Sequence, residues 1–78
     1  MRSKQSLTEP GLAALAKQLR EAAGKTKAEV ARDLGVARPS VFNAEERPEL
    51  SLTKLRIRII EKYSAYRVVG PVFLLQKK

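Results

Sequence analysis

Cysteine, histidine and tryptophan are all absent from this 78-residue sequence. Without cysteine, neither a disulfide framework nor a cysteine-rich metal site can form, so the core of one small domain must be held by packing alone. Without histidine, the chain lacks the commonest general base and the commonest metal ligand. Because the 8 acidic residues show no pairing that suggests acid–base chemistry, we expect neither an enzyme nor a metal or cofactor site.

Acidic residues are also scarce, since 8 Asp and Glu stand against 16 Lys and Arg. The resulting net charge of +8 and the pI near 10.3 indicate a polyanionic partner. Nucleic acid fits best, because a basic domain gains affinity when it displaces counterions from phosphates. RNA and an acidic membrane surface are favoured by charge alone, and an aromatic content of 5% offers few stacking platforms for single strands.

Long apolar runs are missing as well. No segment approaches the roughly 18 apolar residues of a membrane-spanning helix. The first ten residues, MRSKQSLTEP, are charged and polar with no apolar region after them, unlike a signal peptide. We therefore expect a cytoplasmic protein with no membrane partner.

Helical periodicity predicts two helices in the first half of the chain. Thr8 is suited to cap the first one, whose leucine and alanine stripe extends toward a stop at Gly24. Thr26 and Glu29 form a T-x-x-E capping box, in which each side chain can bond the other residue's backbone N–H, and so start a second helix. Gly35 ends this helix, because glycine accepts the left-handed backbone that lets the chain leave at a steep angle.

Two more helices are predicted in the second half of the chain. A third helical pattern opens at Arg38 or Pro39 and ends near Glu46. The fourth helix is expected to run from Ser51, as its N-cap, to about Lys62.

The predicted fourth helix has three kinds of face. Its narrow core stripe consists of Leu52, Leu55, Ile59 and Tyr63. Ile57 and Ile60 point to a second side, which leaves apolar surface for another contact. Its basic residues are expected on a solvated face: Arg56, Arg58 and Lys62.

The final segment, YRVVGPVFLLQKK, is rich in β-branched and aromatic residues and is interrupted by Gly70 and Pro71. This pattern predicts one kinked strand or two short strands, with Lys77 and Lys78 as a solubilising tail. A lone strand needs a partner, either within the chain or from a second subunit. We favour the second subunit, and the expected homodimer interface consists of Ile57, Ile60, Val68, Val72, Phe73 and Leu74.

The segment TKAEVARDLGVARPSVFNAEE, residues 26–46, joins two short helical patterns by a glycine turn. Residues 12–63 resemble the Cro/repressor-type (Xre) helix-turn-helix family, and the resemblance is carried by the joint spacing of Thr26, Ala31, Gly35, Val36, Val41 and Glu45. The following RPELSLTKLRIRIIEKY is similar to the fourth helix of the family's antitoxin branch. The resemblance implies a mainly α fold, a four- to five-helix lambda-repressor-like domain over residues 8–63. A flexible basic N-terminus over residues 1–7 and a short C-terminal β segment over residues 64–78, the expected dimerisation arm, flank this domain.

The resemblance also implies roles for individual residues. Lys27 matches a position that contacts a DNA phosphate, here as a point charge. Recognition-helix positions that face the major groove are matched by Arg38, Ser40, Phe42 and Asn43. Asn43 would bond adenine, Arg38 would read guanine or hold phosphate, and Phe42 would contact a thymine methyl.

Other residues of this region have supporting roles. Pro39 stands at the start of the recognition helix, and the position of Arg47 near a helix end would let it meet a flanking phosphate. Arg20 and Glu45 match a buried ion pair that ties the first helix to the third. Phe42 keeps a second interpretation, since an aromatic residue at a helical position is as often part of the core.

These features predict a sequence-specific DNA-binding transcriptional regulator, a repressor that acts as a homodimer on an inverted-repeat operator in double-stranded DNA. The alternative, from a different class, is the antitoxin of a toxin–antitoxin pair. Such a protein would neutralise a toxin protein and regulate its own synthesis through the same DNA-binding domain, with its C-terminal strand added to the edge of a partner's sheet.

Overall fold

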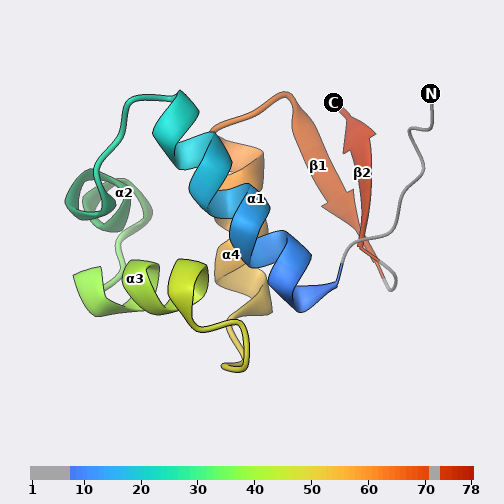
Figure 1. The fold of residues 1–78 in the computed structure, drawn as a ribbon. Helices are drawn as coiled ribbons and strands as arrows, with labels where there is room; N and C mark the ends of the chain where they lie inside the picture. The colour runs from blue at the N-terminus through green and yellow to red at the C-terminus, as the bar shows by residue number, and fades with distance from the viewer. Residues whose placement is uncertain (1–7, 71–72) are drawn as a thin grey trace.

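Four helices followed by a β-hairpin make up the fold in the computed structural model, which describes residues 8–70 and 73–78 (Figure 1). In chain order, the elements are α1 (Glu9–Ala22), α2 (Lys27–Leu34), α3 (Arg38–Glu46), α4 (Thr53–Lys62), β1 (Tyr66–Val69) and β2 (Leu74–Lys77). The expected mainly helical fold with a short C-terminal β segment is confirmed. The expected basic N-terminus over residues 1–7 and the expected interface residue Val72 lie outside the described residues. Within the described ranges, no helix is both long enough and apolar enough to cross a membrane.

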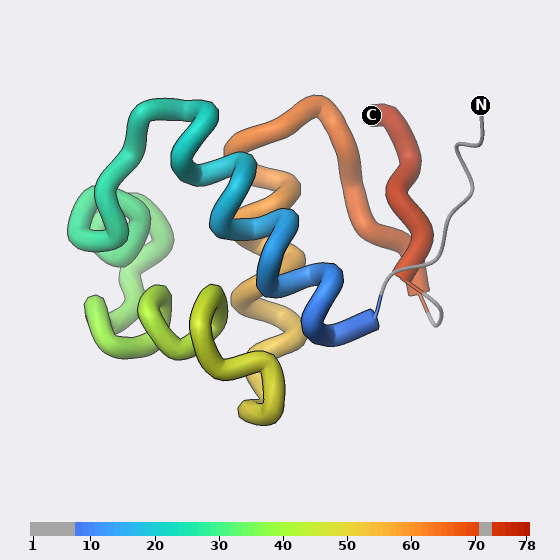
Figure 2. Tube along the Cα trace, viewed as in Figure 1, coloured from blue at the N-terminus to red at the C-terminus, as the bar shows by residue number. Residues whose placement is uncertain are grey.

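The helix α1 packs across α4, and this pair forms the centre of the molecule (Figure 2). The helices α2 and α3 contact each other at one end, whereas the hairpin lies at the other end, where β1 contacts α4. The apolar side chains with no exposed surface come from all four helices: Leu12, Ala16, Val30, Val41, Ala44, Ile59 and Ile60.

Ile60 belongs to this core, contrary to the expectation that it faces a second side of α4. Its side chain has no exposed surface, because both α1 and β1 pack against α4. The buried stripe of α4 is therefore wider than predicted, with Leu55 and Ile59 buried beside Ile60. Leu52 and Tyr63, at the two ends of the stripe, are partly buried against the core.

Local hydrogen bonds confirm the predicted helix starts at Thr8 and Thr26. The Thr8 hydroxyl accepts from the Gly11 N–H at 3.3 Å. In the capping box, the Glu29 N–H donates to Thr26 Oγ1 at 3.1 Å, and the Thr26 N–H donates to Glu29 Oε1 at 2.8 Å. Gly35 ends α2 with a φ of 69°, in the left-handed region where glycine avoids the steric penalty of a Cβ. Thus α2 begins and ends where the sequence predicts.

The starts of α3 and α4 have no side-chain cap. The helix α3 begins at Arg38, the earlier of the two predicted positions. The helix α4 begins at Thr53, so the prediction of Ser51 as its cap is wrong. The Leu52 N–H donates to the Leu50 carbonyl oxygen at 2.9 Å, and this tight turn delays the helix while it places Leu52 against the core.

Arg56 is fully buried, although its position on α4 is expected to be solvated. Its guanidinium donates to the carbonyl oxygens of Ala44 at 2.8 Å, Arg47 at 2.8 Å and Leu50 at 3.1 Å. It also pairs with Glu9 Oε1 on α1 at 2.6 Å. The last carbonyls of a helix lack intrahelical partners, so Arg56 satisfies the end of α3 and the loop that follows it. The expectation of a solvated face is therefore wrong for Arg56.

The strands β1 and β2 form an antiparallel hairpin, so the C-terminal segment forms two short strands that pair within the chain. The register places Tyr66 opposite Lys77, which therefore lies inside β2. The Lys78 N–H donates to the Ala65 carbonyl oxygen at 2.8 Å, and its ammonium donates to the carbonyl oxygen of Glu61. These bonds correct the expectation that the two lysines form a solubilising tail.

The residues of the expected dimer interface do not share one exposed surface. Val68 and Phe73 pack against the helical core of their own chain. Ile60 is fully buried, so the expectation that it contacts a second subunit is wrong. Ile57 and Leu74 are half-buried at the surface.

A hydrogen bond between Tyr63 and Asp33 joins α4 to α2, with the tyrosine hydroxyl donating to Asp33 Oδ2 at 2.7 Å. The bond lowers the pKa of the Asp33 carboxyl, because it stabilises the ionised form. Replacing Tyr63 by phenylalanine is expected to raise this pKa toward its ordinary value of 3.8. A titration of the carboxyl carbon by NMR measures the change.

The same substitution has a predictable effect on stability against pH. Since the pKa of Asp33 is lowered in the folded state, its carboxylate stabilises the fold above about pH 4 and loses this contribution as the pH falls. The stability difference between the wild type and Tyr63→Phe should be largest near neutral pH and shrink below about pH 4. Tyr66→Phe removes the other tyrosine hydroxyl and serves as the control. An Asp33 pKa that is unchanged in Tyr63→Phe would contradict the hydrogen bond.

Candidate nucleic-acid interface

The helices α2 and α3 are joined by the three residues 35–37 and cross steeply, since Figure 1 shows α2 nearly end-on and α3 from the side. The Val36 N–H donates to the Ala31 carbonyl oxygen at 3.0 Å, which closes the turn after Gly35. Ala31 of α2 and Val41 of α3 are both buried in the core, and Val36 of the turn packs against that core. Because α2 and α3 also contact each other, the helix pair is held by core contacts.

A shallow depression lies where the start of α2 meets α3. Its lining residues are Thr26, Lys27, Ala28, Arg38, Pro39 and Phe42. The Phe42 side chain is 48% exposed, so it lies outside the core. The Lys27 ammonium nitrogen is 5.8 Å from the centroid of the Phe42 ring, a distance at which a cation is attracted to the ring face. An exposed aromatic ring and basic side chains therefore share one surface.

The inner and outer faces of α3 carry different residues. Its inner face is formed by the buried Val41, Ala44 and Glu45. Arg38 and Pro39 are exposed, while Ser40 and Asn43 are half-buried. Of the predicted recognition residues, Arg38, Pro39 and Phe42 line the depression with Lys27, whereas Ser40 and Asn43 lie on α3 outside its lining.

Arg47 lies beyond the far end of α3 and is separate from the depression. Its side chain is exposed, and its Nε is paired with Glu49 Oε2 at 2.6 Å. The ion pair lowers the pKa of the Glu49 carboxyl. Because both partners are exposed, the pair holds Arg47 only weakly and leaves its charge accessible.

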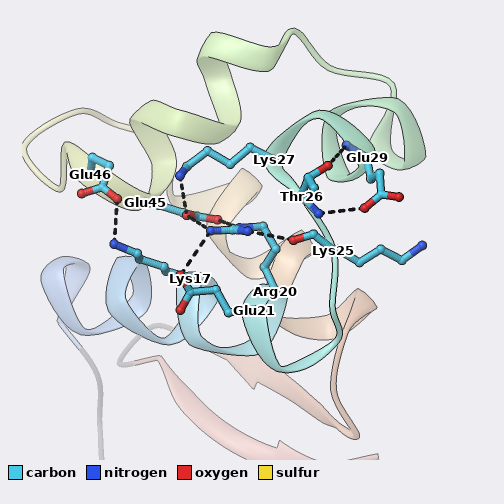
Figure 3. Close-up of polar contacts among 9 residues, drawn as sticks. All are labelled: Lys17, Arg20, Glu21, Lys25, Thr26, Lys27, Glu29, Glu45 and Glu46. Atoms are coloured by element: carbon cyan, nitrogen blue, oxygen red, sulfur yellow. Dashed lines mark hydrogen bonds and ion pairs between the residues drawn. The ribbon is translucent and has the colours of Figure 1, made fainter.

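A buried ion pair beneath the surface ties α1 to α3 (Figure 3). The Arg20 Nε donates to Glu45 Oε2 at 2.6 Å, and its second terminal nitrogen donates to Glu45 Oε1 at 3.0 Å. A third bond runs from Arg20 to the Lys25 carbonyl oxygen at 2.8 Å, in the loop between α1 and α2. The hydrogen bond to Glu45 raises the pKa of Arg20 above its already high ordinary value. The ion pair implied by the family resemblance is thus present in bidentate form.

Lys27 joins this network from the start of α2. Its ammonium is 3.9 Å from Glu45 Oε1, so the same carboxylate faces Arg20 from α1 and Lys27 from α2 (Figure 3). The Lys27 side chain keeps 35% of its surface exposed. It is therefore oriented by Glu45 and still accessible to an anion from outside.

Comparison of the chain with protein-family models, curated proteins and solved structures gives no match. Its function has to be inferred from the charge and geometry of the surface formed by α2 and α3. That surface combines the accessible start of α2, the exposed face of α3 and the ion-pair network that ties α3 to α1 and to the start of α2.

A second link between α1 and α3 is absent from the sequence-based predictions. The Lys17 ammonium pairs with Glu46 Oε2 at 3.0 Å, near the exposed end of α3 (Figure 3). The pair raises the pKa of Lys17 and lowers the pKa of Glu46, each through the hydrogen bond between them. No local pattern marks this pair, because its residues lie on different helices and both side chains suit a solvated face.

Proposed function

We propose that this protein is a sequence-specific DNA-binding transcriptional regulator, a repressor with a helix-turn-helix of the Cro/repressor type. The observation that carries the proposal is the surface shared by α3 and the start of α2, where Lys27, Arg38 and Phe42 line one depression. The excess of 16 basic over 8 acidic residues supports a polyanionic partner. A phosphate anchor and a base-reading helix on one face are the two parts that such a regulator needs.

In this proposal α3 enters the major groove, which is wide enough to admit a helix. Arg38 can donate two hydrogen bonds to guanine, and Asn43 can make a bidentate pair with adenine. Phe42 can contact a thymine methyl, and its 48% exposure leaves the ring available for this contact. The exposed residues of α3 therefore include groups that distinguish base pairs.

The start of α2 would hold a backbone phosphate. The first N–H groups of a helix lack intrahelical partners and carry a partial positive charge, which suits an anion. Lys27 is the first residue of α2, so its ammonium adds a full charge near these groups. A phosphate contact at this point would position α3 in the groove without reading sequence itself.

A homodimer fits this function, because one such module reads only a few base pairs. A twofold dimer would place two copies of α3 in successive major grooves about 34 Å apart. Its preferred site would then be an inverted repeat that mirrors the symmetry of the protein. Binding there would block a promoter that overlaps the site.

Selection of bound sites from a pool of random duplex DNA tests the proposal. The expected result is an enriched inverted repeat whose half-sites are separated by about one helical turn. Binding without enrichment, weakening steeply as salt is added, would instead indicate a general polyanion binder. A chain that binds no duplex at low salt would contradict the DNA-binding function itself.

Two substitutions separate base reading from phosphate binding. Asn43→Ala is expected to weaken the binding free energy on the selected site by about 1–3 kcal/mol and to relax the preference at one base pair.

Lys27→Ala is expected to weaken binding to all sequences alike and to lower the salt slope by about one. Lys62→Ala removes an exposed charge at the end of α4 and is the control. It should leave both the affinity for the selected site and the salt slope unchanged. Anisotropy titrations at several salt concentrations measure all three. An equal loss on selected and random DNA would refute base reading by Asn43.

A further inference from the structure

The two outer edges of the β-hairpin differ in how their backbone groups are satisfied. In an antiparallel pair, residues alternate between those that bond to the partner strand and those whose N–H and C=O point away from it. The Lys78 N–H donates to the Ala65 carbonyl oxygen at 2.8 Å, so these two residues bond toward each other. With the observed register, the residues that point outward are Tyr66 and Val68 on β1, and Leu75 and Lys77 on β2.

The edge of β1 is closed by side chains of its own chain. The Val68 N–H donates to Glu61 Oε2 at 2.9 Å, and the Tyr66 N–H donates to Ser64 Oγ at 3.1 Å. Both outward amides of β1 are thus occupied by groups from the end of α4 and the loop that follows. A further strand could add to this edge only by displacing them.

The edge of β2 is open within the described part of the chain. No residue in the ranges 8–70 and 73–78 accepts a hydrogen bond from the outward N–H of Leu75 or Lys77. Each of these two residues presents one donor and one acceptor in the spacing of a β ladder. Unpaired edge groups of this kind form a template for pairing with another strand.

We infer that β2 pairs with β2 of a second copy of this chain, antiparallel and about a twofold axis at Gln76. In this register Leu75 of each copy lies opposite Lys77 of the other, so the outward donors and acceptors of both residues are all bonded. An axis at Lys77 would place two lysines opposite each other. An axis at Leu75 would place Lys77 opposite Phe73, whose φ of 48° is incompatible with an extended strand. The register about Gln76 avoids both defects.

Closure of the sheet favours a second copy over an unrelated strand. Pairing of β2 with β2 produces a four-stranded sheet in which both outer strands are β1. Because Glu61 and Ser64 close the edge of β1, this sheet is closed on both sides and assembly stops at two copies. A strand from another protein would instead leave its own far edge unpaired.

The pairing supplies the twofold dimer that an inverted-repeat site requires, and to that extent the inference rests on the proposed function. It also changes the expected interface, because the backbone groups of Leu75 and Lys77 make the contact in place of the side chains of Ile57 and Ile60. Val68 stays packed against the core of its own chain. The pairing needs no DNA, so it is tested on the free protein.

Disulfide trapping tests this register in the full chain, which has no cysteine of its own. In the inferred pairing the two Gln76 residues face each other as a non-hydrogen-bonded pair, with Cα atoms about 4.5 Å apart. This separation lies within the range that a disulfide spans. Gln76→Cys is therefore expected to form a covalent dimer under mild oxidation, seen on a non-reducing gel.

Arg67→Cys is the matched control. Arg67 lies opposite Gln76 in the hairpin and is also exposed, and replacing either residue removes the same side-chain hydrogen bond between them. In the inferred sheet the two Arg67 residues are three strand spacings apart, about 14 Å, which is too far for a disulfide. At equal concentration, Gln76→Cys should give at least about ten times more covalent dimer than Arg67→Cys.

Equal cross-linking of the two variants would indicate random collision and overturn the inference. A Gln76→Cys variant that stays monomeric, with a helical circular dichroism spectrum like that of the wild type, would also overturn it. An enriched DNA site without this dimer would reject the pairing and leave the proposed function standing. A dimer that selects no DNA site would support the pairing and reject the proposed function.

Sedimentation equilibrium of variants at Lys77 provides a second test. Lys77→Pro removes one outward N–H but no hydrogen bond of the hairpin, and proline is tolerated at such a position. It should shift the monomer–dimer equilibrium toward the monomer by at least about tenfold, while Lys77→Ala, which keeps the N–H, should not. Equal association of the two variants would contradict the pairing.

Discussion

Replacing Arg56 by methionine is expected to lower the free energy of unfolding by about 3–5 kcal/mol. Arg56 has no exposed surface and holds the carbonyl oxygens of Ala44, Arg47 and Leu50. Methionine fills much of the volume but cannot donate a hydrogen bond. The Ala44 carbonyl oxygen then loses the buried bond from Arg56, whereas the oxygens of Arg47 and Leu50 each keep only the backbone bond from the N–H of Leu50 and Leu52. A hydrophobic replacement can compensate when both partners of an ion pair are changed, whereas backbone carbonyls cannot be removed.

Urea denaturation measures this loss. Low temperature is used because a domain of this size has a free energy of unfolding of only about 5–10 kcal/mol, and the variant would lose much of it. Arg58→Met is the matched control on the same helix, since Arg58 is exposed and, among the described residues, donates to the Leu34 carbonyl oxygen alone, at 2.9 Å. It should cost less than about 1 kcal/mol. Equal losses for the two variants would mean that the buried hydrogen bonds of Arg56 contribute little.

Removing the Glu45 carboxylate is the second substitution with a large expected effect, and Glu45→Ala should cost about 3–5 kcal/mol. The Glu45 side chain has no exposed surface, and its loss leaves the nearly buried guanidinium of Arg20 without its main partner. The remaining neighbour, Glu21, is 3.7 Å from Arg20 and more than half exposed, so it compensates only weakly. The buried link between α1 and α3 would then be lost, while the exposed pair of Lys17 and Glu46 remains.

A double variant separates the cost of an unpaired charge from the value of the pair. Replacing Arg20 by methionine together with Glu45 by leucine removes both charges, so no buried charge is left unpaired. The double variant is expected to be more stable than Glu45→Ala alone, measured by the same urea denaturation. A double variant that is less stable than Glu45→Ala would show that the ion pair itself stabilises the fold strongly. In DNA-binding assays, Glu45→Ala should also weaken the Lys27 contact, because Glu45 orients the Lys27 ammonium.

Features that depend on neighbours within a few residues are predicted well from the sequence. The capping box of Thr26 and Glu29 and the left-handed Gly35 both occur as expected, because each needs only local backbone geometry. The start of α4 is the counterexample. Ser51 has the right chemistry for a cap, but the packing of Leu52 against the core decides where the helix begins.

Arg56 shows why residue type alone misplaces some side chains. Leu52, Arg56 and Ile60 are spaced by four residues, so they share one helix face, and this spacing is a signal that Arg56 lies toward the core. The partners of Arg56 include carbonyls at the end of α3. Since every residue has a carbonyl, no sequence pattern marks those that a distant arginine will meet.

The candidate interface also combines features that the sequence predicts with features that only the packing of the helices decides. The sequence predicts two short helices with a tight turn and places Lys27 and Arg38 near their starts. It leaves open whether Phe42 is in the core or exposed. The structure decides this, because α3 packs against α1, α2 and α4 with Val41 and Ala44 buried and Phe42 outside. The distance between Lys27 and the Phe42 ring likewise depends on how α2 crosses α3.

The sequence by itself determined the order of the helices, the turn at Gly35 and the excess of basic charge, because these follow from local backbone preference and composition. Only the tertiary structure decided that Arg56 is buried, that Phe42 is exposed and that the C-terminal strands pair within the chain. It also decided that Glu61 closes the edge of β1 while the edge of β2 stays open among the described residues. The physical reason is that burial and hydrogen-bond partners are set by elements distant along the chain, which come together only when the whole core forms.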